Sequence, residues 1–373
     1  MNVLHVNMSL NQVTGGGTVE RILQLHKVLM GLGVDSQLLT VNDPKDDIRN
    51  CSLKNVTYLP CLNSRWFIPI PLISQIRKLV EQADVIHLMN HWTLLNVLVY
   101  IQARKQKKPY IVCPAGAMTV YGRSKIKKYF YQLIIGKSIL RNASAAIAIS
   151  PDEVQQLEDN GVSSKTIHQI PNGVNESDFD FTASSLFRES SGIGTSPYIL
   201  FLGRLNSIKG PDLLIEAFAK VCNNFQHNLV IAGPDDGMGE QLKKLVLKLG
   251  LKERVYFTGH LGGVLKSSAY HGADLMVIPS RHEAMSIVAL EAAVTGTAVL
   301  LTEQCGFSAM ADAGTAIESP ATIEGLSTGL TKILIDSCDR KKMGDQGRKF
   351  ALENYSWSIM ARQLESLCRL IRA

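Results

Sequence analysis

Short, continuously apolar runs alternate along this chain with longer segments in which apolar residues recur every third or fourth position. The short runs of the first half show no polar alternation, which predicts strands buried on both faces of a sheet. They comprise residues 2–8, 36–41, 84–89, 110–114 and 145–150. Residues 18–33 are typical of the longer segments: their spacing predicts a helix, which Gly31 and Gly33 would end.

The second half repeats this alternation, with short apolar runs at residues 198–203, 228–233, 254–259, 274–280 and 297–302. Strands buried on both faces and separated by helices predict parallel sheets. We therefore expect an α/β fold with two Rossmann-like, doubly wound sheets that face each other across a cleft. The carboxyl ends of both sheets would open into that cleft, where ligands bind in folds of this kind.

The length of 373 residues also favours two domains, because one hydrophobic core rarely serves so long a chain. The stretch between the two alternating patterns is rich in Ser, Gly, Asp and Asn and lacks a long apolar run. We predict an N-terminal domain, a linker, a C-terminal domain and a terminal helix that packs back toward the N-terminal domain. Their boundaries are 1–170, 171–196, 197–350 and 351–373.

Composition argues against several classes of protein. The chain is 46% hydrophobic and 19% charged, as soluble globular proteins are, and no uncharged apolar run is long enough to span a membrane. The first ten residues lack the basic region of a secretion signal. Seven scattered cysteines without a CxxC pair indicate a reducing compartment. We expect a cytoplasmic protein, and its basic half leaves peripheral association with the inner face of a membrane open.

The net charge of +6 is unevenly distributed. Residues 1–170 carry 19 of the 39 basic and 11 of the 33 acidic residues, a net charge of +8, and the rest of the chain carries −2. The segment 121–141 contains no acid, and its cations and aromatic residues are Arg123, Lys125, Lys127, Lys128, Lys137, Arg141, Tyr129, Phe130 and Tyr131. Such a segment fits an anionic membrane surface or a solvated helix face equally well. Nucleic acid is disfavoured as a partner, because no nucleic-acid-binding motif is present.

Two cations follow one of the predicted strands. In the sequence "GRLNSIKG", Gly203 ends the strand, and Arg204 and Lys209 precede a helix. Guanidinium and ammonium groups both donate hydrogen bonds to phosphate oxygens, so the pair indicates a phosphate site. The alternative is two solvated loop cations, which would be the better interpretation for either residue alone.

Two carboxylates flank the start of the most apolar predicted helix. In "RHEAMSIVALEAA", Glu283 precedes a helix that we expect to begin at Met285 or Ser286, and Glu291 lies about two turns further along. The free N–H groups at the helix start could bind an anion, and the carboxylates suit sugar hydroxyls. The alternative for Glu291 is a buried carboxylate paired with a nearby arginine.

These residues resemble the signature of the retaining glycosyltransferases of family 4, which have the two-domain GT-B fold. The pattern E-x7-E from Glu283 to Glu291 is similar to the family signature, and further motifs follow in the family's order over nearly the full chain. They are a glycine-rich first loop (14–23), an acceptor-side block (84–92 and 109–118), a hinge (170–174) and a diphosphate segment (203–210).

The resemblance implies transfer of a hexose-type sugar from a nucleotide-diphosphate sugar (UDP or GDP), with retention at the anomeric carbon and without a metal or other cofactor. The catalytic residues would be Glu283, Arg204 and Lys209, and the two cations would neutralise the leaving diphosphate. Glu283 would hold the donor sugar and Glu291 the ribose. The remaining donor contacts would come from Ala284, Met285 and Ser286 and from Gly15, Gly16 and Gly17, whose lack of side chains permits close approach.

The chain departs from the family pattern in two places. Gly-Phe often follows the first glutamate of the signature, and here Ala284 and Met285 stand there. Many members carry an acceptor-side histidine where this chain has Ala115. His87 fits the family better than His91, and for both a structural role is at least as well supported as a chemical one. The spacing of the two histidines spans a strand end, which disfavours a metal site.

The resemblance leaves the acceptor and two other functions open. The acceptor would be lipid-linked or a polysaccharide, in the synthesis of a surface glycan. A nucleotide-sugar epimerase on the same fold is one alternative, and a nucleotide-sugar-binding protein without turnover is another. A nicotinamide dehydrogenase is disfavoured, because Glu20 stands where the third glycine of the dinucleotide fingerprint would fall.

Overall fold

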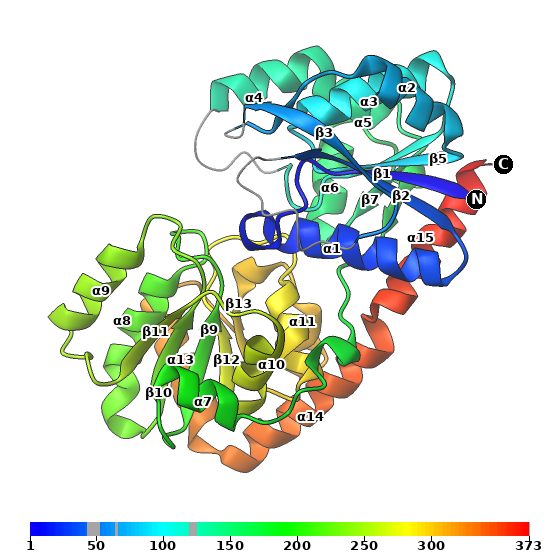
Figure 1. The fold of residues 1–373 in the computed structure, drawn as a ribbon. Coiled ribbons are helices and arrows are strands. Elements are labelled where there is room, and N and C mark those ends of the chain that lie inside the picture. The colour runs from blue at the N-terminus through cyan, green and yellow to red at the C-terminus, as the bar shows by residue number, and fades with distance from the viewer. Residues whose placement is uncertain (43–52, 64–65, 119–124, 373) are drawn as a thin grey trace. The chain divides into compact units, whose positions relative to one another are not determined.

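The computed structural model describes residues 1–42, 53–63, 66–118 and 125–372. The chain divides into two compact units, one formed by Met1–Asn172 with Trp357–Ala373 and the other by Gly173–Ser356 (Figure 1). Each unit has its own sheet and its own buried apolar core. The expectation of two doubly wound α/β domains is therefore confirmed.

The described part of the first unit contains an eight-stranded sheet of order β4-β3-β2-β1-β5-β6-β7-β8. All neighbouring strands pair in parallel except β3 and β4, which are antiparallel. The strands are β1 (Asn2–Val6), β2 (Asp35–Asn42), β3 (Val56–Asn63), β4 (Ile68–Pro69), β5 (Val85–Met89), β6 (Tyr110–Cys113), β7 (Ala145–Ala148) and β8 (Ile167–Gln169).

Helices connect and cover these strands (Figure 1). The amino ends of α3 and α6 are capped by the hydroxyls of Thr93 and Ser150, which accept backbone N–H groups of the first helical turn. The helices are α1 (Gln12–Gly31), α2 (Ile73–Gln82), α3 (Leu94–Lys105), α4 (Lys125–Tyr131), the π-helical η2 (Gln132–Gly136), α5 (Lys137–Arg141), α6 (Pro151–Asp159), η3 (Ser164–Thr166) and α15 (Trp357–Arg372).

The second unit contains a parallel sheet of order β11-β10-β9-β12-β13-β14. Its central strands are buried along nearly their whole length, which explains their continuous apolar sequences. The strands are β9 (Tyr198–Leu202), β10 (Asn228–Ala232), β11 (Val255–Gly259), β12 (Leu275–Ile278), β13 (Val299–Thr302) and β14 (Ile317–Ser319).

The helices of the second unit alternate with its strands. They are η4 (Glu176–Phe179), α7 (Ser185–Ser191), α8 (Pro211–Val221), η5 (Cys222–Asn224), α9 (Gly239–Lys248), α10 (Gly263–Gly272), α11 (Ile287–Val294), η6 (Glu303–Cys305), α12 (Ala309–Asp312), α13 (Ile323–Ile335) and α14 (Ser337–Asn354). No helix in the described ranges is both long and apolar enough to cross a bilayer.

The predicted linker and the observed division of the chain differ. The segment 171–196 contains η4 and α7, and from Gly173 onward it belongs to the second unit. At the other end, α14 continues to Asn354 within the second unit, and α15 belongs to the first unit, where it packs against α1. The low hydrophobicity of 171–196 reflects short helices at the surface of a domain.

Two histidines face each other in the centre of the first sheet. His5 of β1 and His87 of β5 are neighbours across the strand pair, and their Nδ1 atoms are 3.0 Å apart. Both side chains are fully buried. Burial lowers the pKa of His87 to about 3, and it also holds the pKa of His5 well below its usual value. Both rings are therefore neutral at physiological pH.

This pair should make the protein acid-sensitive. A histidine whose pKa is lowered by folding binds its proton mainly in the unfolded state, so the free energy of unfolding should fall as the pH drops from 6.5 toward 3. Each histidine contributes a slope of at most about 1.4 kcal/mol per pH unit. Denaturation across this pH range should show a shallower slope for His87→Gln. Equal slopes in His87→Gln and the wild-type protein would contradict the assignment.

Candidate active site

In the sheet of the second unit, the order in which successive strands are added reverses at the central strand β9. Strands β10 and β11 follow on one side of β9, whereas β12, β13 and β14 lie on the other. Parallel sheets bind ligands outside the carboxyl ends of the strands at such a point. The loops that leave β9 (203–210) and β12 (279–286) begin there, and they hold "GRLNSIKG" and the start of the two-glutamate motif.

Arg281 joins these two loops. Its backbone N–H donates to the carbonyl of Ile208 at 2.7 Å, and its Nη1 donates to the carbonyl of Ser207 at 2.8 Å. Its guanidinium also forms a two-pronged ion pair with Asp212 in the first turn of α8, at 2.8 and 2.6 Å. Paired, planar contacts of this kind fix geometry as well as adding energy. Arg281 therefore holds one loop in register with the other.

Gly210 allows the two loops to approach closely. It adopts a left-handed conformation with φ of 66°, and a Cβ atom there would lie 2.1 Å from the carbonyl oxygen of Pro279. Every other residue type would have to displace one of the loops. The glycine at this position is thus required by backbone conformation and by space at once.

Lys209 and Glu283 form an ion pair across the two loops, with 2.9 Å between Nζ and Oε1. The side chain of Lys209 is 25% exposed and that of Glu283 is 9% exposed. Ser280 donates a hydroxyl hydrogen bond to the same carboxylate oxygen. An ammonium group has three N–H donors, so Lys209 can bind an anion while it remains paired with Glu283.

Arg204 points to a different carboxylate. Its Nη1 lies 3.3 Å from Asp236 in the loop after β10, and both side chains are nearly half exposed. Asn206 also donates to Asp236, and it accepts the backbone N–H of Lys209 through its side-chain oxygen. Exposed ion pairs contribute only about 0–1 kcal/mol, so an anion could draw Arg204 away from Asp236 at little cost.

Helix α11 begins one or two residues later than the sequence predicts. Ile287 is its first residue, and Ser286 occupies the capping position. The hydroxyl of Ser286 is completely buried and makes no hydrogen bond to any described residue. Buried hydroxyls are normally satisfied, so Ser286 is unusual, and it stands at the start of a helix whose first N–H groups could bind an anion. Ala284 and Met285 form the turn that leads to it.

Glu291 is buried inside the fold of the second unit. Its two oxygens accept hydrogen bonds from Lys266 Nζ at 2.9 Å and from the Tyr270 hydroxyl at 2.8 Å. Lys266 also lies over the ring of Phe179, 5.3 Å from its centre. The expected alternative, pairing with an arginine, is therefore replaced by pairing with a lysine and a tyrosine of α10. A carboxylate can accept about four hydrogen bonds, so these contacts leave room for ribose hydroxyls.

The buried cysteines are poor candidates for nucleophiles. Burial raises the pKa of Cys113 to about 11 and that of Cys305, beside Glu283, to about 12. Both groups therefore remain thiols at neutral pH, and a thiol is a much weaker nucleophile than a thiolate.

In the first unit, the three predicted glycines lie within α1 and not in an open loop. Gly16 has non-helical backbone angles and produces a kink in the helix. A Cβ atom at Gly15 would lie 2.1 Å from a methyl group of Val19, so this glycine is needed for packing within the helix itself. Gly17 is exposed.

Ala115 stands in a tight turn after β6. It adopts a left-handed conformation with φ of 51°, which is uncommon for a residue with a side chain. Gly116 donates its N–H to the buried carboxylate of Glu153 at 2.7 Å, and the indole of Trp92 donates to the carbonyl of Ala117. The backbone of this loop is therefore held in place, although Ala115 itself offers no group for proton transfer.

His91 has a structural environment. Its Nε2 donates to the side-chain oxygen of Gln132 at 2.6 Å, and its ring packs edge-on against Trp92 and Tyr131. Burial lowers the pKa of His91. No cluster of three potential metal ligands occurs in the described ranges. His87 and His91 thus both lie in packed surroundings, as their structural interpretation requires.

Arg21 is a buried residue to which the sequence analysis gave no role. Its guanidinium donates to the carbonyls of Ile170 and Pro171 and to the side chain of Asn172. The residues that resemble the family's hinge are thereby fastened to α1. The available signal was an arginine on the apolar face of a predicted helix, where a charge requires partners. No comparable pattern in the sequence indicated which residues pair with Glu291.

Two family models match this chain, and together they cover most of it. Residues 15–178 match Glycosyltransferase Family 4, and residues 184–350 match Glycosyl transferases group 1. Both matches are to glycosyltransferase models and support a family 4 glycosyltransferase, and the chain has the GT-B fold.

Among curated proteins, the chain is 32% identical over 208 residues to an uncharacterized glycosyltransferase of Methanocaldococcus jannaschii, which covers 54% of this chain and 53% of that protein. It is 31% identical over 244 residues to mannosylfructose-phosphate synthase of Agrobacterium fabrum, covering 61% of this chain and 53% of that protein. The chain thus spans about half the length of these relatives.

A solved structure resembles the whole chain. The Anabaena protein Alr3699/HepE in complex with UDP and glucose superposes with a TM-score of 0.81 at 18% identity, over 98% of each chain. At this level of identity the likeness concerns the fold.

The contact between the two loops leads to a prediction about stability. Gly314 is also left-handed, with φ of 69°, but a Cβ atom there would meet nothing within 4 Å. Gly314→Ala should therefore cost only the strain of the backbone, about 1–2 kcal/mol. Gly210→Ala should lower the free energy of unfolding by more, because it adds a clash with Pro279. Chemical denaturation compares the two variants, and equal losses would show that the loops can separate freely.

Proposed function

We propose that this protein transfers a hexose-type sugar from a UDP- or GDP-sugar to an acceptor, with retention at the anomeric carbon and without a metal. The observation that carries the proposal is the Lys209–Glu283 pair next to the unsatisfied hydroxyl of Ser286. A cation, a carboxylate and a helix amino end lie on adjacent loops at the ligand-binding edge of a parallel sheet.

In the proposed mechanism, the diphosphate of the donor binds the N–H groups at the start of α11, the hydroxyl of Ser286 and the ammonium of Lys209. Arg204 leaves its exposed contact with Asp236 to reach the same group. As the bond between the sugar and the diphosphate breaks, negative charge grows on the leaving oxygen, and the two cations stabilise it.

Glu283 and Glu291 have separate proposed tasks. Both observed contacts of the Glu283 carboxylate fall on Oε1, so we assign Oε2 to a hydroxyl of the donor sugar. Lys266 and Tyr270 hold the carboxylate of Glu291, which would accept the ribose hydroxyls. The Anabaena protein with bound UDP and glucose supports a nucleotide sugar as the donor.

We propose a lipid-linked or polysaccharide acceptor and a role in surface glycan synthesis. The basic, aromatic segment 121–141 supports the lipid-linked form. The name of mannosylfructose-phosphate synthase points instead to a small phosphorylated sugar, so acceptors of both types belong in the assay. An epimerase would release an altered free sugar without any acceptor, and a pure binding protein would bind the donor and release nothing.

Removal of the ammonium group tests the diphosphate site. Lys209→Ala should lower kcat/KM for sugar transfer or donor hydrolysis by roughly 10²–10³-fold, the usual cost of removing one group that stabilises developing charge. The matched control is Lys220→Ala, which breaks the exposed pair between Lys220 of α8 and Glu324 of α13. Kinetics with a panel of UDP- and GDP-sugars measures both. Unchanged turnover in Lys209→Ala would overturn the site assignment.

The assignment of Glu291 has a different test. The wild-type protein should bind the preferred nucleoside diphosphate at least about tenfold more tightly than its 2′,3′-dideoxy form, the cost of losing hydrogen bonds to a charged group. Glu291→Gln should lose most of this preference, whereas Glu324→Gln, in the exposed pair with Lys220, should keep it. For each variant, calorimetric titration compares four affinities: those of the variant and of the wild-type protein for the nucleoside diphosphate and for its dideoxy form. A preference retained in Glu291→Gln would place the ribose elsewhere.

A further inference from the structure

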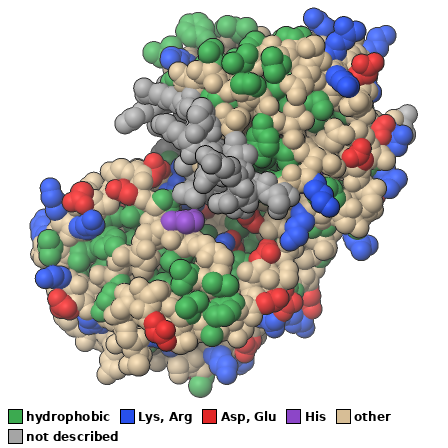
Figure 2. Space-filling view, in the orientation of Figure 1, with side chains coloured by type: hydrophobic (Ala, Val, Ile, Leu, Met, Phe, Trp, Pro, Cys, Tyr) green, Lys and Arg blue, Asp and Glu red, His purple; other side chains and the backbone are tan. Residues whose placement is uncertain are grey.

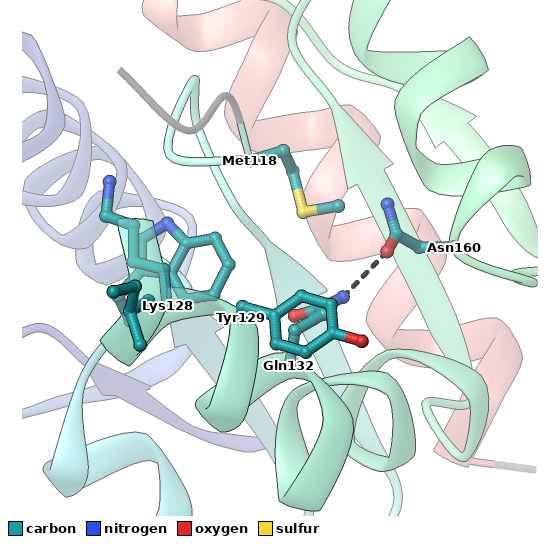
Figure 3. Close-up of a pocket in the computed structure, with 7 residues that line it drawn as sticks. Met118, Lys128, Tyr129, Gln132 and Asn160 are labelled. Atoms are coloured by element: carbon teal, nitrogen blue, oxygen red, sulfur yellow. Dashed lines mark hydrogen bonds between the residues drawn. The ribbon is translucent and has the colours of Figure 1, made fainter. Parts of the chain in front are cut away.

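A cavity of about 490 Å³ lies in the first unit beside α4 and η2. Its size falls within the range of about 300–1,000 Å³ that is usual for ligand pockets. Apolar surface comes from Trp92, Met118, Ile126 and Tyr129. Figure 3 shows Met118 and Asn160 pointing toward Tyr129 and Gln132 across the cavity.

The two amide side chains in the wall of this cavity, those of Gln132 and Asn160, are engaged with each other, and Lys128 and Tyr129 also line the wall. Gln132 donates to the side-chain oxygen of Asn160 at 2.7 Å (Figure 3). Its own side-chain oxygen accepts from His91 at 2.6 Å. The hydroxyl of Tyr131 donates to the carbonyl of His91. A sugar that bound to the amides of Gln132 and Asn160 would have to break this chain of hydrogen bonds. A hydrocarbon would leave the chain intact, so the cavity fits an apolar ligand.

The cavity adjoins an apolar stripe that faces solvent. Ile126, Tyr129, Phe130, Leu133 and Ile134 follow helical spacing along α4 and η2, and their exposed fractions lie between 54% and 75%. The stripe of an ordinary surface helix faces the core, so this orientation needs an explanation. Figure 2 shows hydrophobic side chains gathered over this part of the first unit. Ile126 and Tyr129 belong to the stripe and also line the cavity.

Cations border the stripe. The ammonium of Lys127 lies 4.9 Å from the centre of the Trp66 ring, and that of Lys128 lies 5.4 Å from Trp92. Such contacts hold the charges at the edge of the apolar surface. Lys137 is exposed at the start of α5. Arg141 donates its Nε to the carbonyl of Asn160 at 3.1 Å. Arg123 and the side chain of Lys125, the two remaining cations of the predicted basic segment, lie outside the described residues.

We infer that this face docks on an anionic membrane and that the cavity takes one acyl chain of a membrane phospholipid. The stripe lies against the hydrocarbon boundary, and its cations contact the lipid phosphates. Because two residues of the stripe also line the cavity, an acyl chain can enter from the bilayer without crossing water. The anionic lipid is favoured over other apolar partners by the charge of the segment, which contains no acid from residue 121 to residue 141. The inference goes beyond the proposed transfer reaction and does not depend on it.

Vesicle binding tests the docking surface. The full-length protein should sediment with vesicles of phosphatidylglycerol and phosphatidylcholine, and much less with vesicles of phosphatidylcholine alone. Leu133→Glu should reduce binding at least about tenfold, and removal of each bordering lysine should reduce it roughly fivefold. The matched control is Leu247→Glu on α9 of the second unit, because Leu133 and Leu247 are both 61% exposed. Equal binding by the two glutamate variants would overturn the inference.

Quenching of Trp92 tests the cavity. Phosphatidylglycerol with brominated acyl chains should quench the tryptophan fluorescence of the Trp66→Phe variant. It should quench the Trp66→Phe/Trp92→Phe variant much less, because the buried Trp357 is common to both. Equal quenching in these variants would show that no acyl chain reaches the cavity.

The alternative to membrane docking is that a second copy of this chain covers the stripe. Sedimentation velocity without vesicles should give one species for the wild-type protein and for Leu133→Glu. A wild-type dimer that becomes a monomer in Leu133→Glu would overturn membrane docking. Nucleotide-induced thermal stabilisation of the same samples separates the two proposals. Leu133→Glu should keep the nucleotide-induced stabilisation. If neither the wild-type protein nor any variant were stabilised by nucleotide, the proposed function would be contradicted and membrane docking would not.

Discussion

The close approach of Gly210 to the carbonyl of Pro279 determines how the candidate site of the second unit is built. It brings the loop after β9 against the loop after β12, and Arg281 then fixes their register through Ile208 and Asp212. Only in this register does a lysine of one loop meet a glutamate of the other. The site is therefore assembled by backbone packing, and its charged groups are positioned by contacts that carry no chemistry themselves.

The sequence predicted the fold well because buried parallel strands leave a strong signal. Ten apolar runs correspond to ten observed strands within a few residues at each end. The missed strands have physical explanations. β3 contains Pro60 and is mostly exposed or half-buried, β8 and β14 have three residues each, and β4 has two. β4, β8 and β14 are edge strands, which need neither a long apolar run nor a regular pattern, since one side of each is unpaired. β3 is paired on both sides, but Leu59 is its single buried residue, so it needs no long apolar run either.

The candidate site was predictable in its residues and less so in their partners. Lys209 and Glu283 were expected to act on different parts of a ligand, and they also bind each other. Glu291 was expected to need a partner, but nothing in the spacing identified Lys266 and Tyr270, which approach from α10 only through the fold. In the sequence, the segment that forms α4 and η2 was noted only for its aromatic and basic residues. That it points outward could be learned only from the packed structure, because helical periodicity does not say which face is buried.

The contact between His5 and His87 has a consequence for the proton in the centre of the first sheet. Two neutral imidazoles whose Nδ1 atoms are 3.0 Å apart can share only one hydrogen there, so the rings must be opposite tautomers. The Nε2 atoms of both rings are buried without a partner in the described residues, and one of them must carry a hydrogen while the other carries a lone pair. Two symmetric-looking side chains on adjacent strands are thus chemically unequal. Exchange of their roles requires one proton to cross between the Nδ1 atoms and a second to move from one Nε2 to the other.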